Sequence, residues 1–378
     1  MAGRAAVVAA AWIACLAVVG AGRRGAAEVV LICGTPAGRA AGPPRQDRVN
    51  EPFAVDFDAA GSLWGVEYLR GNRVFRIAAP LGGTPEITFV AGGFHVATEK
   101  DRPRRDDETD AATVRFQGLH DIAVARDGHV FVADTFGQRI RGVHPGAGRV
   151  EVVAGTGEPG FAGDGGPAVA AVFHQPYCCG LEPGGGGLLV ADIRNARLRR
   201  VDLRAGLVAT IAGDGRRGRP VDGAAATATP LTGPRAACMA ADGTIYLALR
   251  EGNAVLEIRA GRLRTVVNAS GDAGHAGDGG PARDALLAGP KYVAVDGRGR
   301  VLIADTENHC IRRYDPQRET IVTVAGVPRQ AGAAVGADLA TTQLSRPHGC
   351  RIAPDGRLVI ADSDNDRVLA GWISLERD

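Results

Sequence analysis

A short segment recurs six times along the chain, and this repetition limits the possible folds more than any other feature. Each copy has a glycine turn and a run of β-branched and aliphatic residues, and five of the six end in an acid, as in residues 128–134, 299–305 and 356–362. Successive positions aligned at the acid are separated by 67, 58, 57, 56 and 57 residues. They are Glu67, Asp134, Asp192, Leu249, Asp305 and Asp362. A period of this length built from short strands is typical of propeller blades.

Each repeat unit contains four strand-like runs joined by turn residues. The first follows a proline in most units, as at 292–295, and the second ends at the acid. The third and fourth resemble residues 139–143 and 150–154. The runs are apolar on both faces, which suits sheets packed between neighbouring sheets. The sequence therefore predicts an all-β fold, a six-bladed β-propeller of four-stranded antiparallel blades.

The last unit lacks its fourth strand, because the chain ends soon after the third. A matching segment stands at the other end, where residues 28–35 resemble residues 151–156. We expect the N-terminal strand to pair into the last blade and close the ring, since closure removes an exposed sheet edge. The propeller is predicted to span residues 28–378.

Residues 1–27 have the three-part pattern of a signal peptide. A short basic start precedes fifteen uncharged residues, and small residues follow at possible cleavage sites. The apolar run is short for a membrane span, so we expect cleavage, no membrane span in the mature chain, and a secreted or periplasmic protein. Six cysteines then remain, and their even number permits disulfides whose pairing the sequence leaves open. They are Cys33, Cys178, Cys179, Cys238, Cys310 and Cys350.

The charge balance argues against nucleic acid as the main partner. The chain has 44 lysine and arginine residues against 42 acids, a formal net charge of +2. Nucleic-acid-binding domains carry a marked basic surplus. Hydrophobic residues make up 45% of the 378 residues, enough for a large core.

The repeat resembles NHL-repeat six-bladed propellers. The resemblance rests on Pro-x-x-Val-Ala-Val-Asp at 290–296, Val-x-Ile-Ala-Asp-Thr-x-Asn at 301–308 and Ile-Arg-Arg at 311–313. The glycine-rich loops at 160–168 and 274–282 also resemble loops between blades of exported NHL proteins. This implies a fold and says little of function, because propellers carry many functions on their loops and sites.

The recurring acids could be interpreted as a ring of metal ligands or as turn caps. A functional site would make one or two blades differ, whereas an acid recurs in five of the six units. Such recurrence favours carboxylates that bond backbone N–H groups within their own blades.

The position directly after the repeat proline varies instead. In a propeller it begins the innermost strand, so its side chains should surround one mouth of the central channel. The six residues are Phe53, His120, Tyr177, Arg235, Lys291 and His348. Varied polar groups converging on one hollow indicate a binding site.

Each side chain in this column suggests a chemistry. His120 and His348 are candidate metal ligands or acid–base groups. Arg235 and Lys291 are suited to hold a carboxylate or another anion. Tyr177 can donate a hydrogen bond or stack on a sugar.

The resemblance adds two enzymatic alternatives. Peptidyl-amidating lyases hold zinc through histidines, including Pro-His positions in the innermost strands. Pro347-His348 matches such a position and Leu119-His120 matches it without the proline, but only two histidines occur in this column. Lactonase-like propellers hold calcium with Glu, Asp and Asn, which this column lacks. We therefore expect a binding scaffold for a protein, peptide or glycan without a required cofactor. The alternative is a metal-dependent lyase or lactonase-like hydrolase at the channel mouth.

Overall fold

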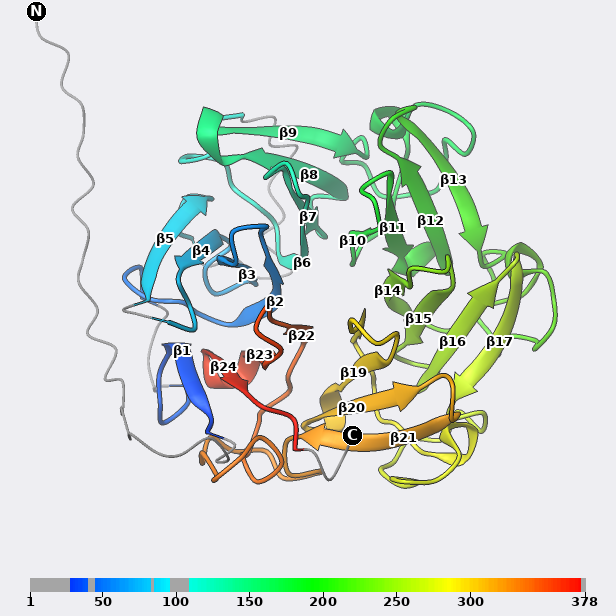
Figure 1. The fold of residues 1–378 in the computed structure, drawn as a ribbon. Coiled ribbons are helices and arrows are strands. Elements are labelled where there is room, and N and C mark those ends of the chain that lie inside the picture. The colour runs from blue at the N-terminus through cyan, green and yellow to red at the C-terminus, as the bar shows by residue number, and fades with distance from the viewer. Residues whose placement is uncertain (1–27, 40–44, 83–84, 96–108, 375–378) are drawn as a thin grey trace, which may run out of the picture.

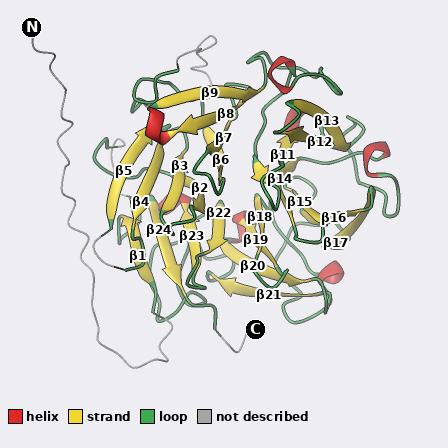
Figure 2. Cartoon of the chain, turned by 45° about the horizontal axis from the view of Figure 1, so that its top comes forward, coloured by secondary structure: helices red, strands yellow, loops and turns green. Residues whose placement is uncertain are grey.

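The computed structural model describes residues 28–39, 45–82, 85–95 and 109–374, and these form six four-stranded antiparallel sheets arranged around a central axis (Figure 1). The predicted six-bladed propeller is confirmed. In the described ranges the helical segments are 3₁₀ turns of three residues each (Figure 2). The predicted signal peptide lies outside the described residues.

Each blade runs from an innermost to an outermost strand in chain order, except the last. Blade 1 comprises β2 (Pro52–Phe57), β3 (Leu63–Glu67), β4 (Val74–Ala78) and β5 (Glu86–Ala91). Blade 2 comprises β6 (Leu119–Val124), β7 (Val130–Asp134), β8 (Arg139–His144) and β9 (Arg149–Ala154). Blade 3 comprises β10 (Gly180–Leu181), β11 (Gly187–Asp192), β12 (Arg197–Asp202) and β13 (Leu207–Ala212). Blade 4 comprises β14 (Pro234–Met239), β15 (Ile245–Leu249), β16 (Ala254–Arg259) and β17 (Arg262–Val267). Blade 5 comprises β18 (Tyr292–Val295), β19 (Val301–Asp305), β20 (Cys310–Asp315) and β21 (Thr320–Ala325). Blade 6 comprises β22 (Gly349–Ile352), β23 (Leu358–Asp362), β24 (Arg367–Gly371) and β1 (Val30–Gly34).

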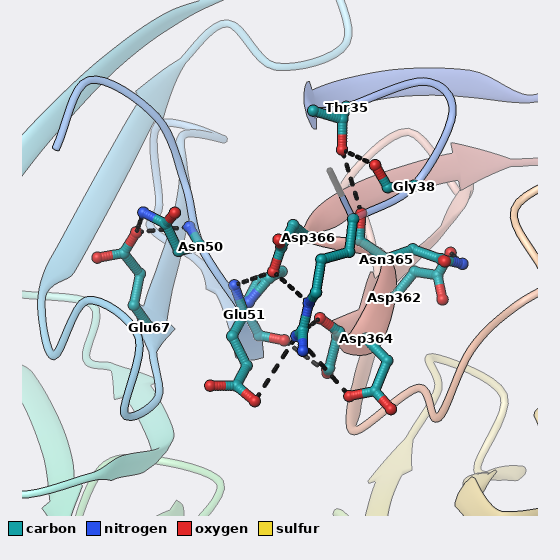
Figure 3. Close-up of polar contacts among 12 residues, drawn as sticks. Thr35, Gly38, Asn50, Glu51, Glu67, Asp362, Asp364, Asn365 and Asp366 are labelled. Atoms are coloured by element: carbon teal, nitrogen blue, oxygen red, sulfur yellow. Dashed lines mark hydrogen bonds and ion pairs between the residues drawn. The ribbon is translucent and has the colours of Figure 1, made fainter. Parts of the chain in front are cut away.

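The N-terminal strand closes the ring, as predicted. Strand β1 pairs antiparallel with β24, with Val30 opposite Ala370 and Gly34 opposite Arg367. The connection continues beyond the strand, because Nε of Arg39 lies 3.2 Å from the carboxylate of Asp366. Figure 3 shows Asp364 and Asp366 of blade 6 close to Glu51 of blade 1 in this region. The first and last parts of the chain are thus joined by backbone and side-chain bonds.

The recurring acids lie inside their blades and cap turns. Asp192, Asp305 and Asp362 each accept a hydrogen bond from a backbone N–H in the loop before the innermost strand, at 2.7–2.8 Å. Each also accepts one from the asparagine three residues later, as Asp305 does from Asn308 at 2.7 Å. Burial raises the pKa of Asp305 to about 7. These carboxylates therefore stabilise the turns of their own blades.

Hydroxyl groups that follow the acid join one blade to the next. Thr135 donates to the carbonyl oxygen of Pro176 at 2.7 Å, and Thr306 donates to that of Pro347 at 2.8 Å. Ser363 donates to the carbonyl oxygen of Pro52, which links blade 6 to blade 1. These bonds fix the start of the innermost strand and therefore the residue after each proline.

The glycine-rich loops between blades are also anchored from within. Asp278 accepts a hydrogen bond from the fully buried Arg312 at 2.7 Å and one from the hydroxyl of Thr323 at 2.7 Å. Asp164 is held in the same way by Arg199 and Thr210. The two loops act as rigid connectors.

The cysteines of the described ranges are all buried, and the structure has no disulfide between them. Within the same ranges, no helix has the length and apolar character needed to cross a membrane.

Candidate binding site at the channel mouth

The structure brings all six residues of the variable column to one cavity of about 340 Å³ at a mouth of the central channel. They are Phe53, His120, Tyr177, Arg235, Lys291 and His348. Phe53, His120 and Arg235 are the second residues of their innermost strands. Lys291 and His348 stand directly before theirs, and Tyr177 lies three residues before β10. Their function in binding remains a prediction, but their convergence is a feature of the fold.

A break in strand pairing turns several of these side chains toward the channel. In blade 2, Leu119 pairs with Asp134 and Asp121 with Ala133, so His120 is the extra residue of a β-bulge. Phe53 and Arg235 occupy the same bulge in blades 1 and 4. A bulge redirects a side chain that regular pleating would place between sheets.

His120 is a neutral ring held in one tautomer. Its Nδ1 atom lies 3.0 Å from the carbonyl oxygen of Gly118 and 2.8 Å from the hydroxyl of Thr135. A carbonyl oxygen only accepts, so Nδ1 carries the proton and Nε2 the lone pair. Burial, with Arg235 and Lys291 nearby, holds the pKa of His120 well below its usual value.

His348 has the same tautomer, and its second nitrogen is occupied. Nδ1 lies 2.8 Å from the carbonyl oxygen of Arg346, while Nε2 lies 2.9 Å from Nζ of Lys291. Burial and the adjacent Lys291 hold the pKa of His348 well below its usual value. A metal ion bound at Nε2 would have to displace the lysine.

Lys291 belongs to a network of four cations and two carboxylates on blades 4, 5 and 6. Burial lowers the pKa of Lys291 to about 7, and Arg346 adds to this while Glu307 opposes it. In this network Glu251 contacts Arg235 at 2.8 Å and Arg250 at 2.9 Å. Glu307 contacts Arg250 at 3.3 Å, Arg346 at 2.8 Å and Lys291 at 3.6 Å. With Lys291 protonated, two positive charges are left without a counter-charge.

Aromatic rings adjoin the cationic network. Phe53 stacks on Tyr68 with ring centroids 4.3 Å apart and on His348 at 3.8 Å. The ring of His120 lies 4.1 Å from that of Tyr177, and the guanidinium of Arg235 lies over the Tyr177 ring. The cavity therefore has a flat, partly apolar surface next to a cationic one.

Sequence reasoning missed two further groups that line the cavity. One follows the acid column and contains Tyr68, Thr135, Phe136, Ile193, Arg194, Arg250 and Asp364; the other precedes the proline and contains Glu51, Gln175 and Arg346. Both groups vary in sequence from blade to blade, as the first column does. This variation is the signal by which they could have been identified as candidate site residues.

The residue before the repeat proline has a positive φ angle in every blade. Three blades have glycine there, at positions 118, 233 and 289. The other three have Glu51 (φ 47°), Gln175 (φ 62°) and Arg346 (φ 46°), and these line the cavity. A side chain in the left-handed region is strained, so its presence where glycine would suffice points to a use for that side chain.

One unit of the chain matches a known repeat. The family model described as the NHL repeat matches residues 287–314, within and before blade 5. Protein SUPPRESSOR OF QUENCHING 1, chloroplastic, of Arabidopsis thaliana is 28% identical over 279 residues, 71% of this chain. The chain spans about a quarter of that relative's length, 26%.

Solved structures share the propeller. An auxiliary nutrient binding protein from Bacteroides ovatus superposes with a TM-score of 0.61 at 13% identity, covering 91% of this chain and 76% of the other. A virginiamycin B lyase from Staphylococcus aureus superposes with a TM-score of 0.52 at 14% identity, covering 92% and 99%. At such identities the likeness shows the fold alone, and that fold serves both binding proteins and enzymes.

Proposed function

We propose that this chain, an NHL-repeat six-bladed propeller, is a binding protein whose channel mouth takes a carboxylate-bearing ligand. The observation that carries the proposal is the network of four cations and two carboxylates at one wall of the cavity. Near pH 7, where Lys291 is partly protonated, the four cations of the network exceed its two carboxylates by one to two charges. This surplus in a partly buried site favours an anion, and guanidinium groups bind carboxylates with fixed geometry.

The rest of the cavity limits the ligand's size and shape. A volume of about 340 Å³ suits one or two sugar units or amino-acid residues rather than a large cofactor. The stacked rings of Tyr68, Phe53 and His348 offer a flat apolar face. An acidic sugar unit of a glycan, or the acidic end of a peptide, has both the charge and the dimensions.

The left-handed residues support use of this mouth. Glu51, Gln175 and Arg346 each retain a side chain at a backbone position where three other blades have glycine. Of these, Arg346 belongs to the cationic network, through its contact with Glu307. Strain kept at a cavity is a common mark of a functional surface.

The metal-dependent lyase or hydrolase alternative stays a prediction with less support. His348 already accepts a hydrogen bond from Lys291, which competes with a metal for the same lone pair. A fold shared with a lyase from Staphylococcus aureus does not carry its activity to this chain.

We further propose that the protein works outside the cytoplasm as a secreted or periplasmic protein. The support is the basic, apolar and small-residue pattern of residues 1–27. Fractionation of producing cells, with N-terminal sequencing of the exported chain, tests this. A chain found in the cytoplasm with residue 1 intact would contradict it.

Calorimetric titration tests the binding proposal with paired ligands. Glucuronic and galacturonic acids are compared with glucose and galactose, and a short peptide with a free acidic end is compared with its amide. We expect one acid series to bind, with an affinity at least about tenfold higher than that of its neutral partner. Which series binds distinguishes glycan from peptide. Equal binding of acid and neutral partners, or none, would overturn the proposal.

A further inference from the structure

A second cluster of chemically competent side chains lies at the other end of blade 2, away from the channel mouth. His129 stands after the turn between β6 and β7, His144 ends β8 and Glu151 lies in β9. Strand β6 begins at the mouth with Leu119, so the turn at its far end lies on the opposite face of the propeller. Nothing in the proposed mouth site involves these three residues, called here the blade-2 histidine cluster.

Strand register brings the cluster together. Val130 pairs with Val143, which sets His129 beside His144 across the β7–β8 pair. On the next strand Glu151 pairs with Gly142. Positions two apart share a face of a strand, so Gly142 and His144 lie on one side of β8 with Glu151 next to them.

The three donor atoms are close to one another. Oε1 of Glu151 lies 3.0 Å from Nε2 of His144 and 3.7 Å from Nε2 of His129. The two imidazole rings stack with centroids 4.2 Å apart. Among the described residues this is a group of three donors all within 4.8 Å of one another.

Both imidazole nitrogens that face the carboxylate are shielded from solvent, and neither makes a hydrogen bond. Oε1 of Glu151 is close to both nitrogens but hydrogen-bonds to neither. Buried polar atoms are usually satisfied, and an ion bound by the two nitrogens and the carboxylate oxygen would satisfy all three.

Gly142 makes this convergence possible. A Cβ atom at that position would lie 2.5 Å from Nε2 of His129 and 3.2 Å from Cγ of Glu151. Any other residue would therefore push His129 out of the space between the strands. The glycine has no positive φ to explain it, so its role here is to leave room over β8.

We propose that the blade-2 histidine cluster binds a divalent transition-metal ion, with zinc as the fitting example. Two imidazole nitrogens and one carboxylate oxygen are a ligand set that Zn²⁺ takes, and donors in a tetrahedral zinc shell lie a little over 3 Å apart, roughly the separations seen here. Arg149 holds the other carboxylate oxygen, Oε2, at 3.2 Å, which leaves Oε1 for the metal. The side chains are 22–37% exposed, so a water or an external ligand completes the coordination.

The test is titration of the purified protein, without a polyhistidine tag, with Zn²⁺ in a calorimeter. We expect one ion per chain. His129→Asn and His144→Asn should each weaken binding by at least about tenfold, the lower limit for disturbing a metal site. His275→Asn is the matched control, because that half-buried histidine lies outside the cluster and bonds Thr323. Absorption of the Co²⁺ form reports the coordination geometry.

A further variant separates the cluster from stray surface binding. Gly142→Ala removes no ligand, yet it should abolish binding because its Cβ occupies the position that His129 needs. Unfolding curves show whether each variant is folded. Lack of Zn²⁺ binding by the wild type, or full binding by a folded double variant, His129→Asn with His144→Asn, would overturn the proposal. Variants at the mouth should leave Zn²⁺ binding unchanged, so the two proposals can fail separately.

Discussion

Nζ of Lys291 lies 2.9 Å from Nε2 of His348, so a lysine and a histidine from neighbouring blades share one hydrogen bond at the channel mouth. The histidine is fixed in its accepting tautomer by the carbonyl oxygen of Arg346. It therefore orients the lysine into the cavity without neutralising it. Replacement of Lys291 or of the neighbouring Arg346 should therefore change the affinity for an acidic ligand.

Replacement of Lys291 should separate charge from shape. Lys291→Met keeps most of the length and removes the charge, so affinity for the acidic ligand should fall by about tenfold, the effect of one charge-assisted hydrogen bond. Affinity for the neutral partner should not change. Arg216→Met is the control, because Arg216 is an exposed cation paired with Asp214 elsewhere. An equal loss in both variants would indicate a general charge effect instead of a site.

Arg346 offers a comparison between two small replacements. Arg346→Ala and Arg346→Gly both remove the guanidinium group, and both should weaken binding of the acidic ligand. They differ in stability, because residue 346 has a φ of 46° and alanine keeps the left-handed strain that glycine lacks. The glycine variant should be more stable by about 1 kcal/mol, measured by denaturant unfolding. An alanine variant as stable as the glycine variant would show that no strain is stored there.

The fold was predictable because each blade repeats the same local signals. The turn glycine, the apolar run and the capping acid recur, and the structure places them alike in every blade that has them. The partner of β1 was predictable for the same reason, since the last repeat lacked a strand that residues 28–35 could supply.

The candidate site was predictable only in part. The column after the proline was recognised, whereas Tyr68 and Arg250 were missed because they lie one residue after the acid position, in a turn at the end of the second strand that also lines the cavity. The blade-2 histidine cluster could not be predicted from the sequence. Its three residues meet only through the register of three strands and the absence of a side chain at Gly142.

Glu51 should make stability depend on pH. Burial raises the pKa of Glu51 to about 7, against 4.5 for the free side chain, with Arg39 opposing and Asp364 adding to the shift. The folded state thus binds a proton that the unfolded state releases between these values. Stability from this group is complete below about pH 4.5, is lost as pH rises to about 7, and stays lost above that.

Glu51→Gln should remove this dependence. The glutamine variant should be more stable than the wild type at pH 8, by at most about 3 kcal/mol, and this advantage should shrink toward pH 4.5. Unfolding curves of both proteins at several pH values measure the difference. A constant difference across that range would contradict the raised pKa.

Deletion of residues 28–35 should open the ring. Strand β24 would then lose its partner β1 and expose a row of backbone groups at the sheet edge. Arg39, which contacts Asp366 of blade 6, would then no longer be preceded by a strand anchored in that blade. We expect a sharply lower melting temperature and a tendency to associate, measured by calorimetry and light scattering.

Arg39→Ala is the graded comparison, because it removes the side-chain contact and keeps the strand. Its effect should be smaller than that of the deletion, because the variant keeps the whole pairing of β1 with β24. An unchanged melting curve after the deletion would mean that the ring is held without β1.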